Sequence, residues 1–376
     1  MKKLYIGLMS GTSMDAVDAA LVDFSHRTPQ LLATHKSNLS DELRNELNNL
    51  CQAESLKIKQ FAELDAKLAH TFADTVVALL KENPTFSKSD ILAIGSHGQT
   101  VFHYPQHHYP FTLQIGDPNI IAEKTGITTV ADFRRRDIAA GGQGAPLTPA
   151  FHNFIFRSEQ EDRIVLNLGG IANITYLPAN AKSSIIGFDT GPANLLLDKW
   201  IQKNTEYKQW YDKDGIWASS AIFDNDLLKQ FLSDPYFDLP PPKSTGHDYF
   251  NLDWLEKHLN LLKKELFPAI TQATLCELTA VSISRAIQQF SSSKNGSIIL
   301  CGGGSKNPYL KARLAEHCHT HQIQLSDELN VPSEWIEAMA FAWFAKQTLE
   351  GKTSNLIEVT GARNSTVLGG IYLKVK

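Results

Sequence analysis

Residues 5–24 read YIGLMSGTSMDAVDAALVDF. Two apolar runs flank a turn of glycine and small hydroxyl residues, and the carboxylates Asp15 and Asp18 follow that turn. This pattern predicts two strands joined by a tight turn over residues 3–24. Backbone N–H groups in a glycine turn can approach a phosphate closely. We therefore interpret the turn as a phosphate cradle; the alternative is an ordinary hairpin in which Asp15 is a solvated turn residue.

The bulk composition is that of an ordinary globular chain. The 376 residues are 43% hydrophobic and 20% charged, and this length allows two cores at about 100–200 residues per domain. The formal net charge of −4 produces no field that would attract nucleic acid or an anionic membrane. The four cysteines form no CxxC pair, and the apolar runs are shorter than a signal-peptide core or a membrane span. We expect a cytoplasmic protein with no nucleic-acid or membrane partner.

Strand and helix patterns alternate along the rest of the chain. Apolar residues at spacings of three and four predict helices over 59–82, 269–290 and 334–349. Residues 162–178 repeat the N-terminal order of strand, glycine turn and strand, so two halves could share one architecture. The Gly- and Pro-rich residues 132–149 predict a loop that is either a boundary or a functional segment. Alternation of strands and helices predicts α/β layers with substantially parallel sheet.

Four glycine turns follow strand-like runs. They are SGTSMD (10–15), NLGGIAN (167–173), DTGPAN (189–194) and CGGGSKNP (301–308). Any one of them could be only a turn, but four together favour a nucleotide with several phosphates. None matches the GxxxxGK[ST] or GxGxxG patterns, so hairpin turns are the expected phosphate sites. In the first turn, Thr12 and Ser13 can donate hydroxyl hydrogen bonds, and Asp15 could bind Mg²⁺ directly or through water.

A single carboxylate, Asp189, stands between an apolar strand and a Gly–Pro turn. At the carboxyl end of a strand it would face the crevice where α/β proteins bind ligands, and it could act as a general base. The alternative is that Asp189 caps the following helix. Glu337, within an apolar helical pattern, is either buried with a partner or on the solvated side of its helix.

Histidines offer a further alternative. His97, His103, His107 and His108 lie close together in the sequence, as do the residues of HCHTH (317–321). A zinc site is conceivable in either place, but neither spacing matches a standard ligand set.

The motifs together resemble one family. In chain order they are GLMSGTSMDAVDAALVDF (7–24), GSHGQTVFH (95–103), DFRRRDIAAGGQGAPLTPAFH (132–152), LNLGGIANIT (166–175), GFDTGPAN (187–194), PPKSTG (241–246), QATLCELTA (272–280) and EAMAFAWFA (337–345). This series is similar to that of the anhydro-N-acetylmuramic acid kinases, which belong to the sugar kinase, actin and heat-shock ATPase superfamily. The resemblance spans nearly the whole chain.

The resemblance implies an α/β, two-domain, actin-like or sugar-kinase fold of the ribonuclease H-like type, with ATP in an interdomain cleft. One lobe would comprise residues 1–130 plus 360–376, and the other residues 131–359. The implied reaction is ATP-dependent phosphorylation of 1,6-anhydro-N-acetylmuramic acid with hydrolytic opening of the anhydro ring. The products would be N-acetylmuramic acid 6-phosphate and ADP, in peptidoglycan recycling. ATP, Mg²⁺ and a homodimer are expected.

The resemblance also assigns site residues. An anhydro sugar has no free 6-hydroxyl, so Asp189 would be the base that activates a water for attack on C1. Sugar binding would involve Gln99, Thr100 and Glu337, with Asn194 as a neighbour of Asp189. The two hairpin turns would hold the phosphates, and CGGGSKNP would lie under the adenosine. The residues expected on the nucleotide side are Gly11, Thr12, Ser13, Met14, Asp15, Ala16, Val17, Asp18, Gly169, Gly170, Asn173, Gly302, Gly303 and Gly304.

Three positions depart from the family pattern. Ala16 and Ala193 replace common glycines, which requires that both backbone positions avoid positive φ. His247 and Asp248 stand where Arg–Glu is usual, and a histidine cannot grip a carboxylate with two hydrogen bonds as arginine can. Recognition of the lactyl carboxylate of the sugar is therefore open. Other readings are a kinase for another anhydro sugar such as levoglucosan, a non-catalytic actin-like ATP-binding module, and a zinc hydrolase.

Overall fold

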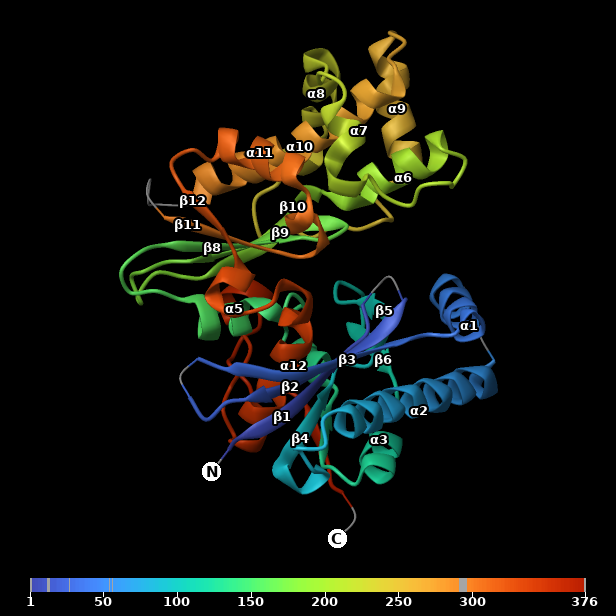
Figure 1. The fold of residues 1–376 in the computed structure, drawn as a ribbon, viewed down its shortest axis with the longest axis vertical. Coiled ribbons are helices and arrows are strands. Elements are labelled where there is room, and N and C mark those ends of the chain that lie inside the picture. Colours follow the sequence, from blue (N-terminus) through green and yellow to red (C-terminus); the bar gives the residue numbers. More distant parts are fainter. Residues whose placement is uncertain are drawn as a thin grey trace. The chain divides into compact units, whose positions relative to one another are not determined.

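The computed structural model describes residues 2–11, 14–26, 28–53, 55, 57–290 and 296–374. The chain forms two compact units. Unit 1 combines residues 1–155 with residues 335–376, and unit 2 is residues 156–334. Figure 1 labels the elements of both units.

Unit 1 contains a mixed sheet with the strand order β13-β7-β4-β1-β2-β3. Its first three strands, β1 (Leu4–Met9), β2 (Ala16–Asp23) and β3 (Gln30–Asn38), form an antiparallel meander. The β1–β2 pair confirms the hairpin predicted over residues 3–24.

Parallel pairing extends this sheet beyond the meander. β4 (Ile91–Ser96) runs parallel to β1, β7 (Thr129–Ala131) runs parallel to β4, and β13 (Gly370–Tyr372) closes the edge antiparallel to β7. A separate two-stranded hairpin is made of β5 (Gln99–Tyr104) and β6 (Phe111–Ile115).

One face of the unit 1 sheet is covered by α2 (Ile58–Glu82), the predicted helix over 59–82. Leu4, Ile6 and Leu8 of β1 share a buried cluster with α2 residues Leu64, Leu68, Phe72, Val76 and Leu79. The apolar period of α2 is therefore its core face, as predicted. Other helices of this unit are α1 (Asp41–Gln52), α3 (Pro118–Thr125), α4 (Phe133–Ala139), α5 (Thr148–Phe156) and α13 (Ile357–Thr360).

The opposite face is covered by α12 (Ile336–Leu349), which packs on β1 and β4 (Figure 1). Because side chains alternate along a strand, Gly7 faces away from Ile6 and Leu8. A methyl group on Gly7 would lie 1.7 Å from the carbonyl oxygen of Ala338, and one on Gly95 would lie 2.0 Å from that of Phe341. Both strands therefore need glycine so that the helix backbone can approach the sheet.

Unit 2 contains a sheet with the order β10-β9-β8-β11-β12. The strands β8 (Arg163–Leu168), β9 (Ile171–Leu177) and β10 (Ile186–Pro192) form an antiparallel meander. β11 (Ser297–Cys301) runs parallel to β8, and β12 (Gln322–Leu325) runs parallel to β11.

The helices of unit 2 bury one large apolar cluster with this sheet. They are α6 (Asn194–Asn204), α7 (Ile216–Ser219), α8 (Asn225–Leu232), α9 (Leu252–Leu262), α10 (Pro268–Phe290) and α11 (Pro308–His317). Short 3-10 turns include η2 (Lys213–Gly215), η3 (Pro235–Asp238) and η4 (Gly303–Lys306). The long helices α10 and α12 confirm the predictions over 269–290 and 334–349.

The two units repeat one topology. In each, three consecutive strands form an antiparallel meander, and two later strands extend the sheet in parallel beside the first strand. The two glycine-turn hairpins, β1–β2 and β8–β9, occupy the same place in the two sheets. The expected duplicated architecture is therefore present, although the sheets are mixed rather than mainly parallel.

The loop predicted over residues 132–149 is wrong in part, because residues 133–139 form α4. This short helix buries Phe133 and Ile138. The buried Asp137 carboxylate also accepts hydrogen bonds from the Gly144 amide and from Asn355 and Thr360. Burial and long-range hydrogen bonds thus order a segment whose composition is that of a loop.

The units also divide the chain elsewhere than expected. Residues 131–155 and 335–359 belong to unit 1, whereas the sequence placed them in the second lobe. The physical reason is packing, since β7 joins the unit 1 sheet and α12 covers the backbone of β1 and β4.

Candidate active site

The first glycine turn joins β1 to β2 in unit 1. Met14 adopts φ 53°, and its amide donates a hydrogen bond of 3.1 Å to the carbonyl oxygen of Gly11. A methyl group added at Gly11 would meet no atom of the described residues within 4 Å. Thr12 and Ser13 lie outside the described residues. Among the described residues, nothing fills the space beside Gly11, as a phosphate cradle requires.

The two carboxylates after this turn have different surroundings. Asp15 is exposed, and its Oδ1 lies 3.7 Å from a guanidinium nitrogen of Arg44. Asp18 lies in β2 opposite Met9, with its Oδ1 3.6 Å from the Lys36 ammonium group. Asp15 is therefore the better placed of the two to meet a ligand from solvent.

The residues between these carboxylates are structural. Ala16 and Val17 are buried in β2. Neither Ala16 nor Ala193 has a positive φ, so alanine fits at both places where the family commonly has glycine.

A buried hydrogen bond connects the first turn to the predicted sugar motif within unit 1. The Ser10 hydroxyl donates to Oε1 of Gln99 at 2.7 Å, and Nε2 of Gln99 donates to the Thr100 carbonyl oxygen at 3.3 Å. Gln99 is 1% exposed. Thr100 Oγ1 accepts a hydrogen bond from Gln114 at 3.1 Å. Gln99 therefore orients the start of β5 relative to the turn through bonds to the protein itself.

Glu337 lies in the first turn of α12 and is exposed, whereas its neighbours Met339 and Phe341 are buried. Desolvation raises the pKa of Glu337, the Arg134 guanidinium lowers it, and Asp18 raises it further. The carboxyl group is therefore reached by solvent and is also surrounded by protein atoms that oppose its ionisation. Of the two alternatives for Glu337, the solvated one is correct.

The sequence analysis missed the role of Arg134 and considered His97 only as part of a conceivable zinc site. Nε of Arg134 donates to Nε2 of His97 at 3.0 Å, and its Nη1 donates to the Gly144 carbonyl oxygen at 2.9 Å. Burial and the adjacent guanidinium hold the pKa of His97 well below its usual value, so the ring stays neutral. The signal for Arg134 was the charge cluster FRRRD inside the 132–152 motif.

The second glycine turn, Gly169–Gly170, joins β8 to β9 and is held by the first residues of α6. The Asn194 amide donates to the Gly169 carbonyl oxygen at 3.1 Å, and its side-chain amide donates to the Leu168 carbonyl oxygen at 3.0 Å. The amides of Ala193 and Leu195 both donate to Gly170. Asn194 thus positions the turn, and its side-chain nitrogen is used in doing so.

The CGGGSKNP motif lies beside this turn within unit 2. A methyl group on Gly304 would lie 3.0 Å from Oδ1 of Asn194, and one on Gly302 would lie 2.3 Å from Oδ1 of Asn167. Gly302 also has φ 79°, where a side chain would be strained. At Gly303 a methyl group would meet no described atom within 4 Å. The structure therefore brings the second turn, Asn194 and Gly302–Gly304 together.

Three polar residues cross the meander of unit 2 in one row. Asn173 is in register with Asn167 on one side and with Asp189 on the other. Directly opposite residues of antiparallel strands place their side chains on the same face of the sheet. Asn167 is a residue that the sequence analysis missed, and the strand register was needed to find it.

Asp189 lies inside β10 rather than after the strand, which corrects the expected strand-end position. The pairing with β9 shifts between Asp189 and Gly191, and Gly191 has φ 151°. Such an irregularity redirects side chains locally. Oδ2 of Asp189 accepts the Thr245 amide at 2.9 Å, and Oδ1 accepts no hydrogen bond within the described part of the chain.

The surroundings of Asp189 bring the pKa of its carboxyl group close to neutral pH, which suits a general base. Burial raises the pKa of Asp189 to about 6, while the Thr245 amide and the Lys243 ammonium group lower it. Lys243 itself donates to the Tyr236 carbonyl oxygen at 3.0 Å, and the Tyr236 hydroxyl donates to the Asp189 carbonyl oxygen at 2.8 Å. The PPKSTG segment thus holds the Asp189 carboxylate, and Tyr236 of η3 holds the Asp189 backbone.

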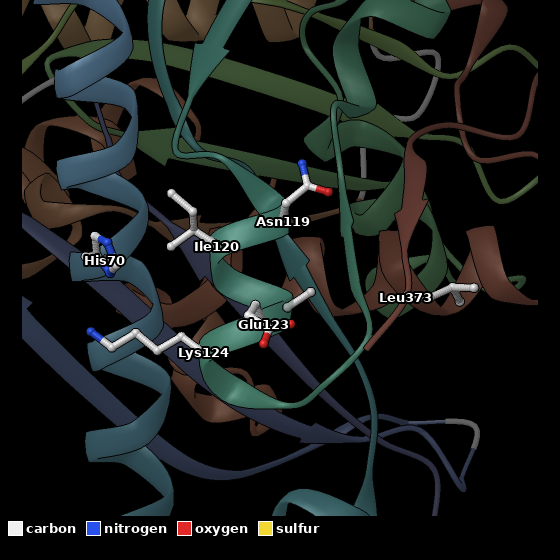
Figure 2. Close-up of a pocket in the computed structure, with 7 residues that line it drawn as sticks. His70, Asn119, Ile120, Glu123, Lys124 and Leu373 are labelled. Carbon is white, nitrogen blue, oxygen red and sulfur yellow. The ribbon is translucent and has the colours of Figure 1, made fainter. Parts of the chain in front are cut away.

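A hollow of about 540 Å³ lies elsewhere in unit 1 (Figure 2). It is lined by His70 of α2, by Asn119, Ile120, Ala122, Glu123 and Lys124 of α3, and by Leu373. None of the predicted site residues that the structure describes is among them. The hollow has neither a glycine turn nor the Asp189 carboxylate, so we do not assign the chemistry to it.

The described residues bear on two further questions, whether they hold a cluster of metal ligands and whether a helix could span a membrane. The described ranges contain no group of three or more His, Cys, Asp or Glu side chains that could hold a metal ion, so the zinc hypothesis lacks a ligand set there. Across the same ranges, each helix is too short or too polar to cross a bilayer.

The repeated topology and the site together define a class. Each unit has a glycine turn between its first two strands, and the third strand of unit 2 carries a carboxylate. This is the arrangement of the actin-like ATPases and sugar kinases, a ribonuclease H-like α/β fold.

Comparison with known sequences gives the particular family. The family profile of anhydro-N-acetylmuramic acid kinase matches residues 3–374. Proteins named anhydro-N-acetylmuramic acid kinase from Coxiella burnetii (strain Dugway 5J108-111) and Pasteurella multocida (strain Pm70) are 51% and 47% identical to this chain. The alignments cover 99% of this chain in both cases, and 98% and 97% of those proteins. The chain belongs to the anhydro-N-acetylmuramic acid kinase family.

Solved structures resemble the chain only distantly. Component A of the (R)-2-hydroxyglutaryl-CoA dehydratase of Acidaminococcus fermentans aligns with 91% of this chain and 97% of its own, at 12% identity and a TM-score of 0.48.

Proposed function

We infer that this protein is an ATP-dependent anhydro-N-acetylmuramic acid kinase that serves peptidoglycan recycling. It phosphorylates 1,6-anhydro-N-acetylmuramic acid at O6 and opens the anhydro ring by hydrolysis, giving N-acetylmuramic acid 6-phosphate and ADP. The observation that carries this inference is the family match over residues 3–374, at about half identity to full-length relatives.

We propose Asp189 as the general base. Its carboxylate has one oxygen bound to the Thr245 amide and the other without a hydrogen bond among the described residues. A pKa of about 6 leaves the group mostly ionised at neutral pH and close to the optimum for proton acceptance. The general-base reading is therefore better supported than a helix cap, because the α6 turn is held by Asn194 instead.

The substrate dictates the chemistry of the step. The anhydro bridge ties O6 to C1, so O6 has no proton to lose. Asp189 removes a proton from a water molecule whose oxygen forms a bond to C1. The C1–O6 bond breaks with its electrons on O6, which takes the γ-phosphoryl group while ADP leaves. Positioning and electrostatic stabilisation supply the rest of the barrier reduction.

We propose that both glycine turns hold the nucleotide. Gly11 leaves open space in the first turn, Gly169–Gly170 lie beside Gly302–Gly304 in unit 2, and Gly303 has room for a neighbour. Asn173 lies in the polar row beside Asp189. The same proposal covers Met14, Thr12 and Ser13 in the first turn, although the last two lie outside the described residues.

Mg²⁺ fits the exposed Asp15 carboxylate, since this ion is commonly bound by one or two carboxylates, several waters and substrate phosphates. It would neutralise phosphate charge there. Asp15 forms an ion pair with Arg44, and this pair would have to open or be shared when Mg²⁺ binds. On the sugar side we propose Thr100 and the exposed Glu337, with Gln99 orienting β5.

The proposal includes a cytoplasmic enzyme that forms a homodimer. Peptidoglycan fragments and ATP meet inside the cell, and the resemblance implies the dimer. Light scattering coupled to size-exclusion chromatography measures the mass directly, and a single species of 41.8 kDa would contradict the dimer.

Product analysis tests the function. Protein, Mg-ATP and the anhydro sugar are incubated in ¹⁸O-water, and the product is examined by mass spectrometry and NMR. We expect label on the C1 hydroxyl and phosphate on O6; an unlabelled C1 or the absence of a sugar phosphate would refute the proposal. Levoglucosan is assayed in parallel, because the exposed His247 and Asp248 stand where the family usually has Arg–Glu.

Asp189→Asn should abolish product formation, whereas Asp198→Asn is its matched control. Asp198 is also a carboxyl group of unit 2 whose pKa burial raises, to about 7, but it lies on α6 rather than on the strand that carries Asp189. Full turnover by Asp189→Asn would leave the non-catalytic ATP-binding alternative in place.

A further inference from the structure

A threonine hydroxyl lies near the Asp189 carboxylate. The Thr245 hydroxyl oxygen is buried and has no hydrogen-bond partner among the described residues. The amide of the same residue donates to Oδ2 of Asp189 at 2.9 Å. Covalent geometry keeps a threonine hydroxyl within about 4 Å of its own amide nitrogen. The unpartnered hydroxyl is therefore in the immediate neighbourhood of the Asp189 carboxylate.

An unpaired buried hydroxyl is costly. Leaving such a group without a partner costs about 1–3 kcal/mol, and native structures rarely keep one without a reason. The segment that carries it is firmly held, since the Asp189 amide donates to the Lys243 carbonyl oxygen at 3.1 Å and the Lys243 ammonium group binds two carbonyl oxygens of η3. Thr245 is thus fixed in place with its hydroxyl unused.

The chemistry of the reaction supplies the missing partner. A water that attacks carbon through one lone pair must direct its two hydrogens to two acceptors. The free Oδ1 of Asp189 can take the hydrogen that leaves as a proton. The second hydrogen needs another acceptor close by, and a threonine hydroxyl oxygen has two lone pairs.

We propose that the Thr245 hydroxyl turns from its buried position to bind the attacking water and, together with Asp189, orients its lone pair toward C1 of the sugar. This inference rests on the proposed function. In the step, one O–H bond of the water breaks and its proton goes to Asp189. The other O–H bond stays intact and donates to Thr245 Oγ1 while the new O–C1 bond forms and the C1–O6 bond breaks.

Thr245→Val tests the role, because valine keeps the shape of threonine and removes the hydroxyl. We expect kcat to fall at least about ten-fold, the effect of one lost hydrogen bond in a transition state, with KM for the sugar nearly unchanged. Thr245→Ser retains the hydroxyl and should keep kcat within a few-fold of the wild type. The matched control is Thr366→Val, which removes another buried hydroxyl without a partner among the described residues, in unit 1.

A second readout separates water positioning from a structural role. In water–methanol mixtures, methanol can also attack C1 and gives the methyl glycoside 6-phosphate. Methanol has one O–H group, which Asp189 accepts, so it does not need the Thr245 acceptor. Loss of the hydroxyl should therefore penalise water more than methanol and raise the methanol-to-water product ratio in Thr245→Val but not in Thr366→Val.

The product ratio does not depend on how much of the variant folds, so it remains informative if Thr245→Val is unstable. An unchanged ratio together with wild-type kcat would overturn the inference and leave the kinase proposal intact. If the wild-type protein makes no sugar phosphate at all, the proposed function itself is refuted, and the two failures are distinct.

Discussion

The dependence of the rate on pH tests whether Asp189 is the base. Burial raises the pKa of this carboxyl group from 3.8 to about 6, against the opposing effects of the Thr245 amide and Lys243. A general base acts only when ionised, so kcat/KM for the sugar should fall as the pH drops through the pKa of the free enzyme.

The expected size follows from the ionised fraction. With a pKa of about 6, roughly nine-tenths of Asp189 is ionised at pH 7 and roughly one-tenth at pH 5, so kcat/KM should fall about ten-fold between them. An unperturbed aspartate would lose only about a twentieth of its ionised form over the same interval. The two cases are easily separated by experiment.

Lys243→Met supplies the perturbation. Removing the ammonium group takes away an interaction that lowers the pKa of Asp189, so the acidic limb of the profile should move to higher pH. Lys243→Arg keeps the charge and should leave the limb close to its wild-type position. Comparing variants under the same conditions cancels any titration of ATP or the sugar.

The assay couples ADP release to a spectroscopic signal from pH 5 to 8.5 at constant ionic strength, with saturating Mg-ATP and limiting sugar. Asp198→Asn serves as the control for the other carboxyl group with a raised pKa in this unit, about 7. A rate that stays flat between pH 5 and 7 would refute the reasoning, as would an acidic limb that moves to lower pH in Lys243→Met or disappears in Asp198→Asn.

Three further predictions concern packing, orientation and the cost of the site. Gly95→Ala places a methyl group 2.0 Å from the backbone of α12 and should lower the free energy of unfolding by about 3 kcal/mol or more, measured with denaturant. Gly303→Ala, whose methyl group has no described atom within 4 Å, should lower it far less. Ser10→Ala leaves the buried Oε1 of Gln99 without its 2.7 Å donor and should cost about 1–3 kcal/mol in the same measurement; an unchanged midpoint would contradict the link. Asp189→Asn should stabilise the fold by about 1–3 kcal/mol at pH 8 and should have no effect near pH 3. The reason is that the pKa of Asp189 is higher in the folded state than in the unfolded state, which costs stability only at a pH where the group ionises. Equal gains in thermal melts at both pH values would show that charge is not the cause.

The sequence alone determined the features that depend on local spacing. The 3–24 stretch predicted the β1–β2 hairpin, and the period of residues 59–82 predicted both α2 and the face that it buries. These succeed because alternation and helical spacing are properties of neighbouring residues, which need no knowledge of what packs against them. Asp189 and the glycine turns were also chosen from the sequence. Glycine and small polar residues after an apolar run indicate where a strand gives way to a turn.

Only the tertiary structure decided which distant residues meet. Thr245 reaches Asp189 from 56 positions away, and the register of three strands places Asn167 in the same row as Asp189. Residues 133–139, loop-like in composition, form a helix because Asp137 is buried against Asn355 and Thr360. In each case the deciding free energy comes from burial and hydrogen bonds between segments that are far apart in the chain, and no local pattern encodes these partners.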